Sequence, residues 1–275
     1  MLPLDLFIIR HGESEGNSAL GQFRKNKKRS DFTLEFLNRH NAHYRLTDQG
    51  REQARVAGDW LKKWLEENRL SWFDHHFVST HTRTLETAAI LDLPSAEWEA
   101  DFQLRERETG VWGVIPDKKW QKRHEMSMRS QRNHRFYTSM PDGESIADVC
   151  NRLRNFIGAL YHECGGDQQV VIVSHGDTIQ ALRVIFEQIL PDRYDELSKE
   201  NSHDFKIGNC QIIHYTRVDP NMPQHTLPDQ FGWVRSINPW NLNYAGHDWR
   251  VIQKNSYDGA ELLVLVARHK RLIKE

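Results

Sequence analysis

The sequence has few cysteines: 275 residues contain only Cys150, Cys164 and Cys210. A disulfide framework or a thiolate zinc site needs several cysteines at short, regular spacings, so three scattered thiols argue against both. This scarcity of cysteine fits a reducing compartment, and we expect a cytoplasmic protein.

Long apolar runs and an excess of charge are also missing. No stretch approaches the roughly 18 consecutive apolar residues of a membrane helix, and the opening MLPLDLFIIR lacks the basic start of a signal peptide. The formal net charge is -1, so no global electrostatic field favours nucleic acid. We therefore expect neither a membrane nor a nucleic acid as a partner.

Short apolar runs alternate with segments of helical periodicity along most of the chain. The predicted strands are Leu4–Ile9, Phe77–Ser79, a short extended segment leading to Leu104, Val170–Val173 and Gln211–Tyr215. Helices are predicted after a Thr47 cap, over Thr82–Leu91, from a Ser145 cap with Asp148 three residues on, and over Thr178–Leu190. This alternation predicts an α/β fold, a three-layer αβα sandwich whose mostly parallel central sheet carries helices on both faces.

The chain length fits one large domain, and we predict a single domain over residues 1–275. Three segments do not follow the alternation of strands and helices. Residues 14–45 are polar and are expected to be irregular, residues around 114–140 form a polar, basic insertion, and residues around 220–275 form a C-terminal extension. In that extension, Glu261–Ile273 is compatible with either a strand or a helix.

Two predicted strands end in a histidine that is followed by glycine, at His11-Gly12 and at His175-Gly176. The carboxyl ends of the strands line the ligand crevice of an open α/β sheet, so both imidazoles can lie at the same edge. Glycine also lets backbone N–H groups approach an anion closely. The two strand ends therefore predict an anion site.

Other residues near the predicted strand ends suit a phosphate group. Arg10 and Arg83 can each bring a planar guanidinium to the same edge, and Asn17 can add a neutral donor. Glu106 follows the third extended segment and offers a carboxyl group for proton transfer, with Glu108 as a rival.

The segment RHGESEGN at 10–17 resembles the signature of the histidine phosphatase superfamily, in the branch of the cofactor-dependent phosphoglycerate mutases and related phosphatases. Five further segments resemble the family's motifs in the same order: LTDQGREQA at 46–54, STHTRTLETA at 79–88, LRERETGVWG at 104–113, PDGES at 141–145 and SHGD at 174–177. Ordered motifs are a much stronger signal than a lone RHG. The resemblance implies a phosphoglycerate mutase-like fold.

The resemblance also implies the roles of the site residues. His11 takes the phosphoryl group as a phosphohistidine, and Glu106 protonates the leaving alcohol and then activates water. The implied ligands of the phosphoryl oxygens are Arg10, Arg83, His175, Asn17 and the N–H of Gly176. Neither a metal nor a cofactor is implied. For attack, His11 must be neutral on the nitrogen that faces phosphorus, and its other nitrogen is expected to donate to a backbone carbonyl.

In the family, the basic segment around 114–140 lies over the active site as a lid. Its positive side chains are either an exposed helix face or contacts for a second negative charge on the substrate, and the candidate contacts are Lys118, Lys122 and Arg123. We therefore expect a small phosphorylated substrate, with a polyanionic one as an option. A homodimer is also compatible with the sequence.

The expected activity is metal-free hydrolysis of a phosphomonoester. One alternative is a phosphoglycerate mutase, although Glu108-Thr109 replaces the mutases' His-Tyr pair and the lid lacks their Arg-Arg-Ser run. A second alternative is a non-catalytic module that binds a phosphorylated ligand. Such a module should lack one of the core groups, whereas all of them are present.

Overall fold

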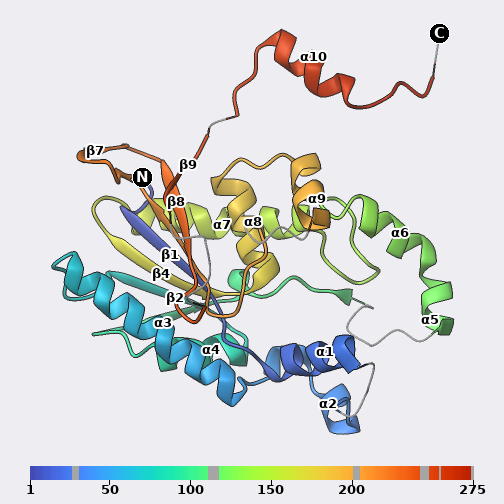
Figure 1. Ribbon diagram of the computed structural model, residues 1–275, viewed down its shortest axis with the longest axis horizontal. Coiled ribbons are helices and arrows are strands. Elements are labelled where there is room, and N and C mark those ends of the chain that lie inside the picture. Colours follow the sequence, from blue (N-terminus) through green and yellow to red (C-terminus); the bar gives the residue numbers. More distant parts are fainter. Residues whose placement is uncertain (27–30, 111–117, 201–204, 242–247, 254, 274–275) are drawn as a thin grey trace.

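The structure is a computed structural model that describes residues 1–275 except 27–30, 111–117, 201–204, 242–247, 254 and 274–275. Its central sheet has the strand order β3-β2-β4-β1-β5-β8-β9 (Figure 1). The strands of this sheet are β1 (Asp5–Arg10), β2 (His75–Ser79), β3 (Trp98–Asp101), β4 (Gln169–Ser174), β5 (Ile212–Thr216), β8 (Trp233–Ile237) and β9 (Arg250–Val251). A separate two-stranded sheet pairs β6 (Val218–Asp219) with β7 (Met222–Thr226).

The central sheet is mostly parallel, as the sequence predicts. Strands β1 to β4 pair in parallel, β5 is antiparallel to both β1 and β8, and β9 is antiparallel to β8. The carboxyl ends of four adjacent strands therefore meet at one edge of the sheet. The expected C-terminal extension adds β8 and β9 to this same sheet, and one domain over the whole chain stays a prediction.

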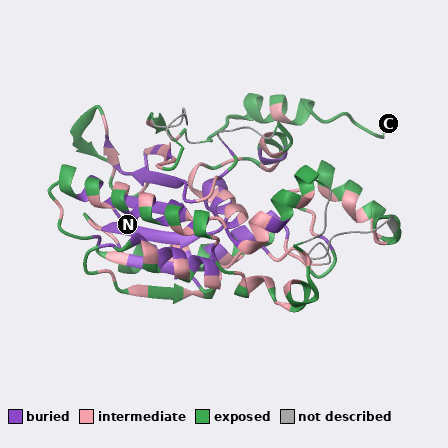
Figure 2. Ribbon diagram, turned by 60° about the horizontal axis from the view of Figure 1, so that its bottom comes forward, coloured by how far each residue is buried: buried purple, intermediate pink, exposed green. Residues whose placement is uncertain are grey.

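Helices cover both faces of the sheet. The helices of the described residues are α1 (Glu15–Asn26), α2 (Leu34–Asn38), α3 (Asp48–Glu67), α4 (Thr82–Leu91), α5 (Lys118–Arg123), α6 (Glu125–Asn133), α7 (Ile146–Glu163), α8 (Gly176–Phe186), α9 (Pro191–Glu200) and α10 (Gly259–Ala267). Alternate β1 residues separate the two cores: Phe7 and Ile9 pack with α3 and α4, whereas Leu6 and Ile8 pack with α7, α8 and α9. Figure 2 shows the central strands buried between helices whose outer faces are exposed. The three-layer αβα prediction is confirmed.

Three of the four predicted helix starts are confirmed, whereas the helix predicted over Thr178–Leu190 begins at Gly176 and ends at Phe186. The Thr47 hydroxyl accepts the Gly50 N–H at 3.1 Å, and Ser145 and Asp148 form a capping box at the start of α7. The prediction of an irregular segment at 14–45 was wrong, because it contains α1, α2 and the 3-10 turn η1 (Asn41–His43). The polar composition hid α1, in which Glu15 in the first turn and basic residues in the last turn suit the helix dipole.

The C-terminal segment Glu261–Ile273, which was compatible with a strand or a helix, is helical as far as Ala267. Asp258 and Glu261 form a capping box at the start of α10. This helix is apolar yet exposed, with Leu263 at 70% and Val264 at 65% relative exposure. No helix in the described ranges is long and apolar enough to cross a membrane.

Candidate active site

The two strand-end histidines lie side by side at the carboxyl edge of the sheet. Strands β1 and β4 are neighbours whose register pairs Arg10 with Ser174, which places His11 and His175 one residue beyond each end. The ring centroids are 5.2 Å apart, and the residues are only 2% and 0% exposed, respectively. The expected convergence of these two imidazoles is therefore present in the fold.

The hydrogen bonds of His11 match the form that a nucleophile needs. Its Nδ1 lies 2.7 Å from the carbonyl oxygen of Gly12, which assigns the ring proton to Nδ1. Arg83 Nε donates to Nε2 at 3.2 Å, so Nε2 carries the lone pair. Burial, followed by the positive charges of Arg83 and Arg10, lowers the pKa of His11 well below its ordinary value. His11 is therefore neutral at neutral pH, with Nε2 facing a guanidinium.

The two arginines bring positive charge to this edge with neutral partners. Arg10 Nη1 donates to the Ile207 carbonyl at 2.7 Å, and Arg83 Nη1 donates to the Asn41 carbonyl at 2.7 Å. Burial lowers the pKa of both guanidiniums, but the ordinary pKa of arginine is so high that both stay charged. The Arg10 side chain also lies against the first turn of α8, since a methyl group on Gly176 would be 3.6 Å from Arg10 Nε.

His175 is held by a neighbouring strand. Its Nε2 shares a hydrogen bond of 2.8 Å with the hydroxyl of Ser79, the last residue of β2. Its Nδ1 is buried and has no hydrogen-bond partner within the described residues. Burial and then the charge of Arg83 lower the pKa of His175 well below its ordinary value, so the ring is neutral. The ring of His81 packs 4.7 Å away and completes a buried cluster of imidazoles.

Glu106 lies on the segment that follows β3 and the short turn η2 (Phe102–Leu104). This segment is fastened to the β4 edge, because the Ser174 hydroxyl donates to the Leu104 carbonyl and the Thr178 hydroxyl donates to the Arg105 carbonyl. Burial, and then the charge of Asp177, raises the pKa of Glu106. A raised pKa favours the protonated carboxyl group that a general acid needs.

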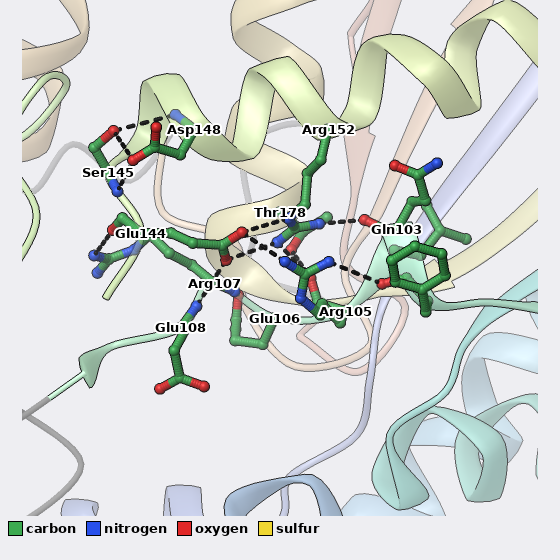
Figure 3. Close-up of polar contacts among 12 residues, drawn as sticks. Gln103, Arg105, Glu106, Arg107, Glu108, Glu144, Ser145, Asp148, Arg152 and Thr178 are labelled. Carbon is green, nitrogen blue, oxygen red and sulfur yellow. Dashed lines mark hydrogen bonds and ion pairs between the residues drawn. The ribbon is translucent and has the colours of Figure 1, made fainter. Parts of the chain in front are cut away.

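Glu144, in the PDGES segment, positions the chain around Glu106 (Figure 3). Its carboxylate accepts hydrogen bonds from Arg105 and Arg152, both at 2.8 Å, and from the backbone N–H of Glu108 at 2.9 Å. The rival carboxylate of Glu108 accepts the N–H of Gly110, two residues along. Glu106 is therefore the carboxylate of the pair that lies within the field of Arg10 and Arg83.

Asn17 is linked to His11 through Asn209, and its side-chain carbonyl oxygen is already engaged. Oδ1 accepts the N–H of Ser14 at 3.3 Å and the side-chain amide of Asn209 at 3.2 Å. Asn209 also donates to the backbone carbonyl of His11 at 3.0 Å. The side-chain amide nitrogen of Asn17 is the group that can serve an anion.

The basic insertion makes a different contact from the one the sequence predicts. Lys122 and Arg123 lie exposed on α5 and have no ion pair or hydrogen bond within the described part of the chain, and the side chain of Lys118 lies outside it, as do residues 111–117. Arg135, after α6, instead reaches Asp177 at 2.8 Å. The residues of the insertion that would contact a substrate stay a prediction.

Sequence reasoning missed four residues of this site: His81, Glu144, Asp177 and Asn209. Three of them lie inside the recognised motifs, which gave a signal that they are close to the site but not what they contact. Asn209 lies just before β5, in a stretch without a motif, and only the fold brings it to His11. Among the described residues, no group of three or more His, Cys, Asp or Glu side chains could hold a metal ion.

Comparison with known proteins identifies the family. The family model of the histidine phosphatase superfamily (branch 1) matches residues 6–217. The chain belongs to this superfamily. The match covers the strands and loops that carry every residue of the candidate site and ends before β6.

Relatives in this superfamily include both mutases and phosphatases. A phosphoglycerate mutase-like protein of Arabidopsis thaliana is 25% identical over 242 residues, or 80% of this chain and 71% of the relative. A 2,3-bisphosphoglycerate-dependent phosphoglycerate mutase of Rhizobium etli is 29% identical over 189 residues, or 67% of this chain and 80% of the mutase.

Solved structures share the fold at lower identity. A mycobacterial glucosyl-3-phosphoglycerate phosphatase in complex with VO3 has a TM-score of 0.56 at 22% identity, covering 77% of this chain and 92% of that one. A phosphoserine phosphatase of Entamoeba histolytica in complex with 3-phosphoglyceric acid has a TM-score of 0.56 at 21% identity, covering 82% and 96%. These likenesses establish the phosphoglycerate mutase-like histidine phosphatase fold.

Proposed function

We propose that this protein hydrolyses a phosphomonoester through a phosphohistidine on His11, without a metal ion. The observation that carries the proposal is the state of His11, whose Nδ1 proton is held by the Gly12 carbonyl and whose Nε2 lone pair faces the Arg83 guanidinium. An imidazole in this state is a ready nucleophile beside a cation that can take a phosphoryl oxygen.

In the first step, His11 Nε2 forms a bond to phosphorus while the bond from phosphorus to the ester oxygen breaks. Glu106 gives its proton to the departing oxygen, so the alcohol leaves neutral. Arg83 exchanges its hydrogen bond with His11 for a phosphoryl oxygen, and Arg10 with His175 stabilises the remaining oxygens. The raised pKa of Glu106 supports its role as the proton donor.

In the second step, the ionised Glu106 takes a proton from water, whose oxygen attacks phosphorus. The bond between phosphorus and Nε2 breaks, inorganic phosphate forms, and His11 and Glu106 return to their starting states. The covalent intermediate divides one difficult displacement into two easier ones.

Turnover of p-nitrophenyl phosphate in EDTA, together with trapping of a phosphohistidine from a phosphate-labelled substrate in alkaline denaturant, tests this proposal. We expect the activity to survive the chelator. The phosphorylated protein should form in the wild type and be absent in His11→Ala. Glu108→Gln is the matched control for Glu106→Gln, because the two carboxylates are only two residues apart. The positive charges of Arg83 and Arg10 act on the Glu106 carboxylate. Equal losses in the two glutamine variants would contradict the assignment of Glu106.

A phosphoglycerate mutase is the second candidate function, since the Rhizobium etli relative has that activity by name. A mutase must shield its phosphohistidine from water and pass the phosphoryl group to another hydroxyl. Incubation with 3-phosphoglycerate separates the two functions. Release of inorganic phosphate supports hydrolysis, whereas conversion to 2-phosphoglycerate without phosphate release supports the mutase.

The substrate class is proposed to be small phosphorylated metabolites, with the basic insertion as a contact for a second negative charge. Exposed Lys122 and Arg123 are the described side chains that could make this contact. Reversing both to glutamate should raise KM more for a polyanionic substrate than for p-nitrophenyl phosphate. An unchanged KM for both would refute a role of these two residues.

A further inference from the structure

Asp177, the second residue of α8, is held between two guanidinium groups from separate segments. Arg107 Nε donates to Oδ2 at 2.6 Å, and Arg135 Nη2 donates to Oδ1 at 2.8 Å. Its side chain is only 22% exposed. Burial alone would raise the pKa of Asp177, but the charges of Arg107 and Arg135 outweigh burial and the pKa is lowered. Asp177 is therefore an anion and not a second proton donor.

Asp177 with Arg107 and Arg135 forms a clamp, and this clamp matters because Arg107 is the neighbour of Glu106 in the chain. Arg107 follows Glu106 directly, and its backbone N–H already donates to Glu106 Oε1 at 3.0 Å. Its guanidinium, however, is turned to Asp177 and to the backbone carbonyl of Glu144, which is 3.1 Å away. A guanidinium free to turn toward the neighbouring carboxylate would form a charge-assisted pair and favour its ionised form.

The other charges around Glu106 come from several elements. Arg10 of β1, Arg83 of α4, Arg107 on the same segment and Arg152 of α7 all interact with it and favour its carboxylate. The charge of Asp177, on α8, acts in the opposite direction. Asp177 thus opposes ionisation of Glu106 by its own charge and also binds the guanidinium of Arg107, the residue that follows Glu106.

We propose that Asp177 is a positioning residue that holds the Arg107 guanidinium away from Glu106 and so keeps Glu106 as a proton donor. This inference rests on the proposed function, in which Glu106 protonates the leaving oxygen. The second arm of the clamp, Arg135, comes from the end of the basic insertion. The backbone N–H of its neighbour Phe136 donates to the side-chain carboxylate of Asp195 at 2.9 Å.

The test compares two substrates that differ in their need for a proton. Nitrophenolate leaves readily without protonation, whereas an alkoxide such as that of glycerol 3-phosphate does not, so a weaker proton donor slows only the second substrate strongly. We expect Asp177→Asn to lower kcat/KM at pH 7 about tenfold more for glycerol 3-phosphate than for p-nitrophenyl phosphate. This factor corresponds to a decrease of about one unit in the pKa of Glu106. The basic limb of the kcat/KM profile for glycerol 3-phosphate should move to lower pH.

Two further variants separate positioning from a structural role. Asp192→Asn changes the second residue of α9, where the ion pair with His269 is exposed, and should leave both kcat/KM values unchanged. Adding Arg107→Gln to Asp177→Asn removes the guanidinium that the proposal says must be restrained, so the basic limb should move back toward higher pH. Such non-additivity is expected of residues that act through one another.

The proposal is overturned if Asp177→Asn lowers both substrates by the same factor and leaves the pH limits unchanged, because Asp177 would then serve the fold alone. It is also overturned if Arg107→Gln fails to shift the basic limb of the double variant. A wild-type chain that turns over neither substrate would instead disprove the proposed function, and this inference with it.

Discussion

Replacing Gly50 with alanine tests how tightly two motifs, far apart in the sequence, pack beneath the candidate active site. Gly50 belongs to the LTDQG segment at the start of α3, and it faces the backbone of Glu13, two residues after His11. A methyl group on Gly50 would lie 2.7 Å from the Glu13 nitrogen and closer still to its carbonyl oxygen, whereas 3.4–4 Å is ordinary contact.

The Glu13 backbone cannot move aside easily. Its N–H donates to Gln53 at 2.8 Å, and its carbonyl accepts the N–H of Thr47 at 2.9 Å. At a helical position, glycine to alanine ordinarily stabilises by about 0.5–1 kcal/mol. The steric overlap costs about 1–3 kcal/mol and should outweigh that gain. We therefore expect Gly50→Ala to lower Tm by roughly 2–6 °C, at about 2–4 °C per kcal/mol for a chain of this size.

The matched control is Gly158→Ala in α7, where an added methyl group meets nothing within 4 Å. This variant should raise Tm by about 2 °C, because it gains helix propensity without an overlap. Thermal unfolding followed by circular dichroism gives both shifts. Turnover of p-nitrophenyl phosphate should fall in Gly50→Ala alone, since Glu13 is joined to the His11-Gly12 turn. Equal increases in Tm for both variants would refute the reasoning.

Three other measurements test the structure. Burial lowers the pKa of His214 from 6.5 to about 4, so the unfolded chain binds more protons between these values. The free energy of unfolding should therefore fall as pH drops through this range, by at most ~1.4 kcal/mol per pH unit from this residue, and urea unfolding at pH 7 and pH 5 should show a shallower dependence in His214→Gln. Glu144→Gln weakens the ion pairs with Arg105 and Arg152, so we expect the free energy of unfolding in urea to fall by about 2 kcal/mol and kcat to decrease. An unchanged kcat would mean that the position of the segment before Glu106 does not depend on this carboxylate. Deleting residues 259–275 removes mostly exposed side chains and should change stability by less than about 0.5 kcal/mol, whereas a large drop in Tm would show that α10 supports the fold.

The sequence predicted those parts of the site whose residues directly follow a recognisable buried strand. The arrangement of His11 and His175 follows from two buried strands that each end in His-Gly, because parallel strands place their carboxyl ends at one edge. The helices at 15–26 and 34–38 were missed, because a polar segment with few buried residues carries little hydrophobic periodicity.

The local sequence pattern left Glu106 and Glu108 open, and only the family resemblance favoured Glu106. The two carboxylates are two residues apart in an irregular segment, where no periodicity predicts which one faces the site. The decision comes from long-range contacts, since Glu144 binds the Glu108 N–H and Thr178 binds the Arg105 carbonyl. The clamp on Asp177 is equally invisible, because its two arginines lie 70 and 42 residues away in the chain.

The distribution of arginine partners indicates where an anion belongs. Arg107 and Arg135 share the carboxylate of Asp177, and Arg105 and Arg152 share that of Glu144. Arg10 and Arg83, in contrast, donate to backbone carbonyls and to His11. Carbonyl and imidazole partners accept hydrogen bonds without cancelling the charge, and Arg10 Nε is buried with no partner among the described residues. The two cations also repel each other.

Buried cations without a carboxylate partner are costly, and that cost is smallest when a bound anion supplies the missing charge. A neutral His11 and His175 add no further positive charge, so the two guanidinium charges are the ones that a phosphoryl dianion would offset. Inorganic phosphate or vanadate should therefore stabilise the protein against thermal unfolding more than a monoanion of similar size. Because Arg83→Ala removes one of the two charges, it should reduce this stabilisation by a larger factor than Arg105→Ala, whose guanidinium belongs to Glu144.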